Sequence, residues 1–188
     1  MRGMCVYMSE KKVFWYVLFS RTGVEERLAM VLKNRFDDDD FLPFVPQKTC
    51  VFRRQGKRTL FRKVCFPGYV FIESSKSTMD FIERARPIVD KQNDAYRFLS
   101  YGDRYELAMR DEERIALSKI FGEDKHMDIS TGFKDGDSVR VISGALVGKE
   151  SIIQKVNVGR REAVIEVPMF GTTVSVSVGF EMLKAVAD

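Results

Sequence analysis

The last third of the sequence constrains the fold most, because its apolar residues come in runs that are too short for helices. Four such runs, rich in Val and Ile, are separated by Gly, Asn and Pro: Ser138–Ser143, Ser151–Val156, Ala163–Val167 and Thr172–Val178. In the last run Val alternates with Thr and Ser, as in a strand with one buried face. This spacing predicts a small all-β barrel.

The sequence before this region mixes strand and helix patterns. Val13–Phe19 is short, aromatic and β-branched, which indicates a buried strand. Thr22, with Glu25 three residues later, has the form of a capping box at the start of a helix. Two more helices are predicted over Ser77–Arg86, ended by a proline, and Asp111–Phe121, ended by a glycine. These elements predict an α+β fold class.

A basic hairpin is predicted between the first and second helices. Lys48–Arg54 and Lys57–Val64 flank Gln55-Gly56, which favours two strands joined by a tight turn, and Phe66–Glu73 predicts the next strand. The hairpin carries six basic residues and no acidic one over positions 53–63: Arg53, Arg54, Lys57, Arg58, Arg62 and Lys63. Such a cluster binds phosphates with release of counterions. The alternative is a solvated hairpin that charge keeps soluble.

The polar segment Glu123–Gly132 has no apolar period and is predicted to be a linker. This linker separates a domain of residues 13–122 from a domain of residues 133–188. Residues 1–12 are predicted to form an N-terminal tail. Residues 133–188 carry seven basic and seven acidic side chains, so the net charge of +4 comes entirely from the part before them. Charge therefore favours the N-terminal part as the region that meets a polyanion.

No catalytic or metal-binding set is apparent in the sequence. The single histidine, His126, lies in the predicted linker, so histidine triads and multi-histidine metal sites are poorly supported. Asp37–Asp40 is expected to be a solvated loop, because consecutive carboxylates do not converge on one ion. We expect no enzymatic activity, no metal and no cofactor.

The chain is expected to be cytoplasmic, without a membrane partner. Cys5, Cys50 and Cys65 are odd in number and form no Cys-x-x-Cys pair, as expected of free thiols in a reducing compartment. The first residues lack the apolar run of a signal peptide. No later run approaches the roughly 18 apolar residues of a membrane span.

Several motifs, in their order along the chain, resemble the NusG family of transcription elongation factors. They are Trp15-Tyr-Val17, a glycine before the first helix, the proline-containing Leu42–Pro46, the hairpin, Phe66-Pro-Gly-Tyr-Val70 and Phe133-Lys-Asp-Gly-Asp-Ser-Val-Arg-Val-Ile-Ser-Gly144. The resemblance covers nearly the whole chain. It implies an N-terminal α/β sandwich, the NGN domain, and a C-terminal SH3-like barrel, the KOW domain.

The resemblance also implies a site for RNA polymerase, because the NGN domain of this family binds the clamp helices of that enzyme. The residues that match this surface are Trp15, Phe66, Pro67, Gly68 and Tyr69. On this hypothesis, Phe66 and Tyr69 leave the core and present their rings to the partner helices. The alternative is that both rings are buried within the domain.

The basic hairpin and the C-terminal pattern resemble the LoaP group, a specialised branch of the family. Members of this group are processive antiterminators that an RNA stem-loop recruits to particular operons. The resemblance therefore implies a nascent RNA hairpin as a partner, bound by the six cations named above and by Arg160 and Arg161. Two residues depart from the family pattern: Ser151 stands at the KOW glycine, and Arg110 at the usual Ser or Thr cap of the last NGN helix.

The expected function is antitermination by binding, in which differential affinity favours the closed, elongating state of polymerase. Two alternatives stay open. A general NusG would couple polymerase to Rho, or to the ribosome through the KOW domain. A polymerase-independent RNA-binding module is the other, since similar barrels occur in ribosomal proteins.

Overall fold

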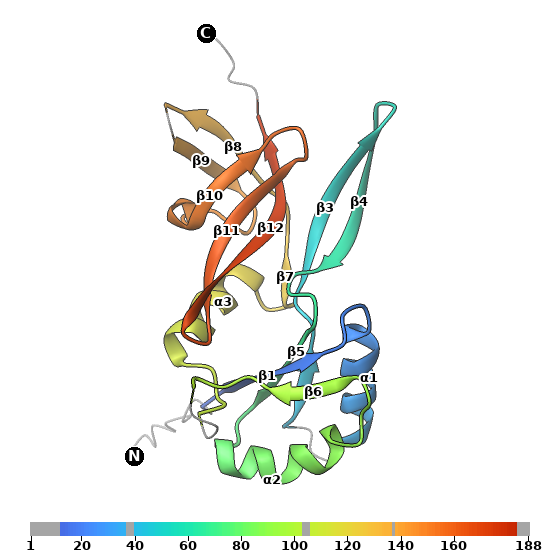
Figure 1. The fold of residues 1–188 in the computed structure, drawn as a ribbon. Coiled ribbons are helices and arrows are strands. Elements are labelled where there is room, and N and C mark those ends of the chain that lie inside the picture. The colour runs from blue at the N-terminus through green and yellow to red at the C-terminus, as the bar shows by residue number, and fades with distance from the viewer. Residues whose placement is uncertain (1–11, 37–39, 103–105, 137, 184–188) are drawn as a thin grey trace, which may run out of the picture.

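The computed structural model describes residues 12–36, 40–102, 106–136 and 138–183, with Arg54 described by its backbone (Figure 1). Cys5, residues 1–11 of the predicted tail and most of the Asp37–Asp40 loop lie outside these ranges. Within them, strands and helices form an N-terminal unit, residues 12–127, followed by a β unit, residues 130–183. The predicted α+β fold class is confirmed.

The N-terminal unit is built on an antiparallel sheet of strand order β2-β5-β1-β6. The strands are β1 Phe14–Ser20, β2 Leu42–Phe44, β5 Tyr69–Ser74 and β6 Ala95–Phe98. Strand β1 is buried on both faces because its side chains alternate between two apolar clusters. Trp15 and Val17 join one cluster, whereas Tyr16 and Leu18 join the other.

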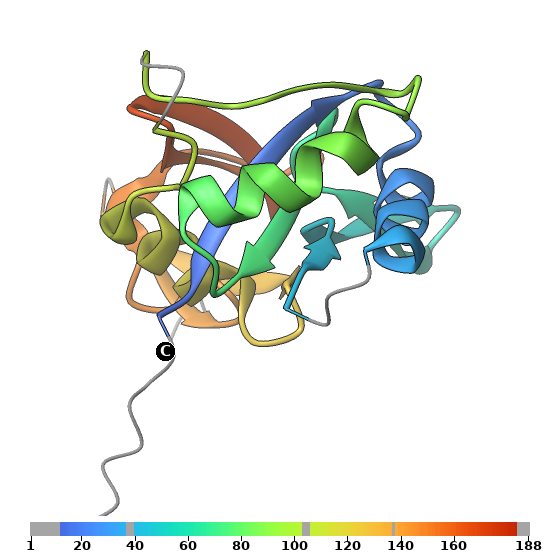
Figure 2. The same cartoon turned by 90° about the horizontal axis from the view of Figure 1, so that it is seen from below.

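Two helices, α1 Glu25–Arg35 and α2 Thr78–Val89, pack on the Tyr16 face of this sheet. Figure 2 shows α2 lying across the sheet on the side away from the β unit. Phe81 stacks on Tyr16 with 3.7 Å between the ring centroids. These contacts bury the apolar sides of both helices, which accounts for the helical spacing in their sequences.

Helix α2 begins where predicted but ends later. The Asp80 N–H donates to Ser77 Oγ at 3.4 Å, so Ser77 is the N-cap. The prediction that Pro87 ends the helix is wrong, since α2 continues to Val89 and the Asp90 N–H still donates to the Arg86 carbonyl. Proline removes one hydrogen bond from the last turn, while burial of Val89 holds that turn against the sheet.

The start of α1 also differs from the prediction. Val24 is the N-cap residue and forms no side-chain cap, so the capping box predicted for Thr22 and Glu25 is wrong. The Glu25 carboxylate instead accepts hydrogen bonds from the N–H groups of Gly23 at 2.9 Å and Gly68 at 2.6 Å. The Glu25 carboxylate, which a capping box would use, therefore binds the loop that contains Gly68.

The basic hairpin forms as predicted, with β3 Gln47–Arg54 paired to β4 Lys57–Val64. Gln55 and Gly56 both have positive φ, 50° and 78°, as a two-residue type I′ turn requires. In Figure 1 the hairpin extends away from the helices and runs beside the β unit. Its base is widened to three strands by β7, His126–Met127, which pairs parallel to β3.

The predicted linker contains regular structure. Strand β7 lies inside Glu123–Gly132, and strand β8 starts at Ser130, so strands occupy part of the predicted linker. His126 is buried, and its Nε2 lies 2.7 Å from Thr49 Oγ1. The polar sequence of β7 gives no strand pattern, and the strand forms because it pairs with β3, which is distant in the sequence.

The β unit contains the predicted short strands, in the order β10-β11-β12-β8-β9. Its elements are β8 Ser130–Asp135, β9 Ser138–Ser143, the 3-10 helix η1 Glu150–Ile152, β10 Ile153–Asn157, β11 Glu162–Met169 and β12 Thr172–Met182. Val176 and Val178 are buried, as their alternation predicts. Ser151, which stands at the family glycine, lies in η1.

The two units share one apolar cluster. Helix α3, Asp111–Phe121, closes the Trp15 face of the sheet and contacts β11. Trp15, Phe66 and Phe121 belong to the same cluster as Ile165 and Phe180 of the β unit. The β unit is therefore docked on the N-terminal unit through buried apolar side chains (Figure 1).

Glu113 links α3 to the tight turn between β11 and β12. Its carboxylate accepts the N–H groups of Phe170 at 3.0 Å and Gly171 at 2.8 Å, and it also accepts the hydroxyl of Tyr101. Burial, with the Glu113 carboxylate beside it, raises the pKa of Tyr101, so its hydroxyl stays protonated and donates. One buried carboxylate thus serves three donors, two of which, the Phe170 and Gly171 N–H groups, belong to the β unit.

We expect Glu113→Ala to loosen the docking of the β unit. The substitution leaves three donors without their acceptor, at a cost of roughly 1–3 kcal/mol for each donor that stays buried. Hydrogen exchange at the Phe170 and Gly171 amides should therefore accelerate. The matched control is Glu112→Ala, an exposed neighbour on the same helix, which should leave exchange unchanged. Equal protection in both variants would show that Glu113 does not hold the turn.

Candidate functional site

The basic hairpin presents cations on both of its faces. Lys48 lies opposite Lys63, Thr49 opposite Arg62, and Arg53 opposite Arg58. Directly paired side chains project to the same face, where like charges repel each other. Arg53, Lys57, Arg62 and Lys63 are exposed, and none has an acidic partner in the described part of the chain. A bound polyanion would relieve this repulsion.

The structure brings hairpin and β-unit cations together around Glu181. Arg58 Nη2 lies 2.9 Å from Glu181 Oε2, and Arg161 Nε lies 3.8 Å from Glu181 Oε1. Arg160 is exposed on the neighbouring turn, where its backbone N–H donates to Asn157 Oδ1. The two groups of predicted RNA-binding residues thus meet at one acidic side chain.

Apolar side chains on the hairpin form part of the site that sequence reasoning missed. Phe52 is 54% exposed and Phe61 37%, whereas Leu60, which is 49% exposed, lies on the opposite face of the hairpin and is not part of this site. The Lys63 ammonium lies 5.2 Å from the centroid of the Phe61 ring. Nothing in the sequence distinguishes these rings from core-facing strand residues, and only their exposure in the folded chain identifies them.

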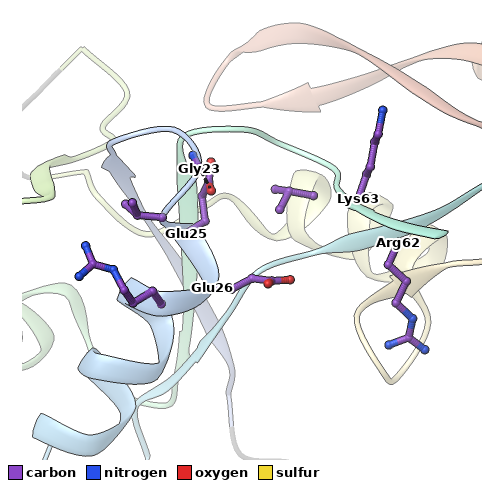
Figure 3. Close-up of a pocket in the computed structure, with 8 residues that line it drawn as sticks. Gly23, Glu25, Glu26, Arg62 and Lys63 are labelled. Atoms are coloured by element: carbon purple, nitrogen blue, oxygen red, sulfur yellow. Dashed lines mark hydrogen bonds between the residues drawn. The ribbon is translucent and has the colours of Figure 1, made fainter.

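A cleft of about 430 Å³ lies between the base of the hairpin and the start of α1 (Figure 3). Glu26, Arg62 and Lys63 line it, and Arg62 and Lys63 point away from one another, as neighbours on a strand do. Both signs of charge are present at its wall. The Arg27 guanidinium beside it is paired with Asp94.

Phe66 was expected to leave the core, but its ring is buried. It is 3% exposed, and its ring centroid lies 5.7 Å from that of Phe71 and 5.9 Å from that of Phe121. Trp15 is also buried, and its Nε1–H donates to Glu73 at 2.8 Å. The prediction failed because α3 ends over this face and places Phe121 against both rings.

The remaining residues of the Phe66–Tyr69 segment, which we call the step, have different environments. Pro67 is exposed, and Tyr69 is partly buried against Phe19 at 5.6 Å between ring centroids. Gly68 has φ of +87°, and a Cβ there would lie 3.2 Å from Thr22 Oγ1. The turn therefore leaves Pro67 exposed and Tyr69 partly exposed.

Glu25 fixes this turn through its short contact with the Gly68 N–H. Burial alone would raise the pKa of Glu25, but the N–H groups of Gly68, Glu25 itself and Gly23 together lower it. The ionised carboxylate is therefore the form that the folded chain prefers.

Glu25→Gln should cost roughly 1–3 kcal/mol of unfolding free energy at neutral pH, the range for a hydrogen-bonded charge. Because the folded pKa is depressed, this stability is present above the unfolded value of roughly 4.3 and is lost as pH falls through the folded value. Denaturant titrations across that window should show the wild type converging on the variant. An exposed carboxylate provides the control, in Glu83→Gln. A difference that does not change with pH would contradict the role given to the charge.

The described residues offer little for catalysis. Burial raises the pKa of Cys65 to about 12, so its thiol is a poor nucleophile at neutral pH. No group of three or more His, Cys, Asp or Glu is arranged to hold a metal in the described ranges. In the same ranges, no helix has the length and apolar character needed to cross a bilayer.

The fold is a helix-covered sheet with a protruding basic hairpin, followed by a small β unit. A family model described as "Transcription termination factor nusG" matches residues 13–118. The chain belongs to the NusG family. It is therefore a transcription termination/antitermination factor and not an enzyme.

The chain is also similar to individual proteins. The "Transcription termination/antitermination protein NusG" of Thermus thermophilus is 27% identical over 180 residues, covering 91% of this chain and 98% of the relative. The protein of the same name from Neisseria meningitidis serogroup B is 23% identical over 185 residues, covering 95% and 99%. A solved structure titled "Domain interaction in Thermotoga maritima NusG" covers 89% of this chain and 94% of that chain, with 21% identity and a TM-score of 0.49.

Proposed function

We propose that this chain is an antitermination factor of the LoaP type, which binds RNA polymerase through its N-terminal unit and a nascent RNA stem-loop through its basic hairpin. The observation that carries the RNA part is the exposure of Arg53, Lys57, Arg62 and Lys63 without acidic partners in the described ranges. Cations held on a stiff hairpin lose little freedom on meeting phosphates, and they release counterions from the RNA.

The function follows from tethering. RNA bound to the hairpin holds the factor near the polymerase that is still making that RNA, which raises its local concentration at the enzyme. The N-terminal unit then acts by binding the elongating state of polymerase more tightly than the paused state. Nothing in this scheme requires bond chemistry by the chain itself.

The polymerase contact is proposed at the Phe66–Tyr69 step, with Trp15 beneath it. Phe66 and Trp15 lie in the cluster that the β unit shares, so their rings are not accessible in the docked form. Exposed Pro67 and partly buried Tyr69 are the accessible part of the step. We infer that fuller use of this surface by the clamp helices requires the β unit to move away.

The test is recovery of the protein from its own cells with whatever is bound to it. Polymerase subunits and one strongly enriched leader RNA are the expected partners. Recovery of RNA without polymerase would favour the polymerase-independent module. Recovery of polymerase without an enriched RNA would favour a general elongation factor.

A second candidate function is coupling of polymerase to the ribosome or to Rho through the β unit. It is favoured by apolar side chains that the β unit exposes to solvent: Ile142, Val147 and Val158. Recovery of Rho or of a small-subunit ribosomal protein, lost on changing these residues to Ser, would support it.

A further inference from the structure

The proposed RNA site contains two exposed aromatic rings on one face of the hairpin. In the pairing of β3 with β4, Cys50 lies opposite Phe61 and Phe52 lies opposite Thr59. Paired residues share a face, and so do residues two apart on a strand. Phe52 and Phe61 are therefore diagonal neighbours on the same face, and both are accessible while the β unit is docked.

Cations border this pair of rings along the hairpin. By the same alternation, Lys57 lies toward the tip and Lys63 toward the base on the face that holds Phe52 and Phe61. The Lys63 ammonium is 5.2 Å from the Phe61 centroid. Leu60 belongs to the opposite face, with Arg62 and Arg58 on either side of it along β4. Among the described side chains, one face thus combines rings with lysines, and the other combines an aliphatic side chain with arginines.

The charge around the rings identifies the kind of partner. A protein surface that covered them would have to bring its own acidic groups to every flanking cation. A nucleic acid supplies phosphates at regular spacing and also bases with flat apolar faces. Bases in a closed RNA duplex are stacked on each other, and side chains cannot enter its deep major groove. Only unpaired bases can lie against Phe52 and Phe61.

We propose that Phe52 and Phe61 form a stacking surface for unpaired bases, so that the hairpin selects an RNA loop or bulge rather than a plain duplex. This inference rests on the proposed RNA-binding function and adds the class of RNA that the site takes. The lysines meet the backbone phosphates beside the stacked bases, while Arg53 and Arg62 of the other face, which have no acidic partner in the described ranges, remain available to the stem.

Two synthetic RNAs separate stacking from charge: a stem closed by a loop of unpaired adenosines, and the same stem closed by a flexible linker without bases. The full chain should bind the looped RNA more tightly. Phe52→Ala and Phe61→Ala should each weaken binding of the looped RNA by about 5- to 150-fold, corresponding to ~1–3 kcal/mol per stacked base. Binding of the linker-closed RNA should stay within about twofold of wild type, with an unchanged salt dependence.

The controls come from the same hairpin. Leu60→Ala removes an equally exposed apolar side chain from the other face and should change neither affinity. Phe52→Trp keeps an aromatic ring and should preserve binding of the looped RNA. Equal binding of both RNAs by the wild type and by the Phe variants would overturn the stacking surface while leaving the charge-based site. If neither RNA binds, the proposed function fails as well. If the Phe variants lose polymerase and keep RNA, the rings belong to a protein interface.

Discussion

Phe66→Ala is expected to destabilise the folded chain by about 3–5 kcal/mol, because truncating a buried Phe removes its apolar contacts and leaves a cavity. The ring is 3% exposed and packs against Phe71 and Phe121. These neighbours cannot move freely to fill the space that the smaller side chain leaves. A loss of this size is a large part of the stability of an ordinary domain. Denaturant unfolding followed by circular dichroism would measure it.

The matched control is Phe61→Ala, which removes the same side chain from an exposed position on the hairpin. Its effect on unfolding should be within about 1 kcal/mol, in the range of surface substitutions. If Phe66→Ala unfolds like the wild type while losing polymerase, the buried position of this ring is wrong and the ring itself is the polymerase contact.

Replacing the four exposed hairpin cations together should make RNA binding much less dependent on salt. The variant changes Arg53, Lys57, Arg62 and Lys63 to Ala. Each phosphate contact contributes roughly 0.7–0.9 to the slope of log affinity against log salt, so the slope should become shallower by about 3. Affinity at low salt should fall by several orders of magnitude for a looped RNA. Titrations at several salt concentrations provide both quantities.

A charge-matched variant distinguishes a site from a general loss of positive charge. It changes four exposed cations outside the hairpin to Ala: Lys33, Arg35, Lys91 and Lys119. Both variants lower the net charge equally, but only the hairpin variant should show the shallower slope of log affinity against log salt. If Arg160→Ala or Arg161→Ala abolishes binding while the hairpin variant binds normally, the RNA site belongs to the β unit.

Elements fixed by local chemistry could be predicted from the sequence. The hairpin was located to within a residue because Gln55-Gly56 suits the positive φ values of its turn. Ser77 was recognised as a cap because it bonds a backbone group three residues away. The alternating valines before Gly179 identified a strand because one side of it is buried in the β unit.

Features that depend on distant partners could not be predicted. Glu25 has the local form of a capping residue, but Gly68 takes its carboxylate, and nothing near Glu25 in the sequence indicates that competitor. Phe66 is buried by Phe121, whose position depends on the docking of α3. Strand β7 exists because β3 lies beside it, not because its two residues favour a strand.

The candidate site divides in the same way. Its cations were visible as a run of like charge, whereas the ion pairs of Arg58 and Arg161 with Glu181 require the docked β unit. Phe52 and Phe61 looked like ordinary apolar strand residues. Only their exposure in the folded chain distinguishes them from core residues.

RNA held by the hairpin is expected to make this factor prevent termination by polymerase. A transcription assay tests it, with polymerase from the same cells, a template encoding the recovered leader RNA upstream of a terminator, and a template in which the stem-loop is scrambled. We expect the wild type to increase read-through on the first template alone, and the four-cation hairpin variant to increase it on neither. Equal read-through on both templates, or full activity of that variant, would contradict it.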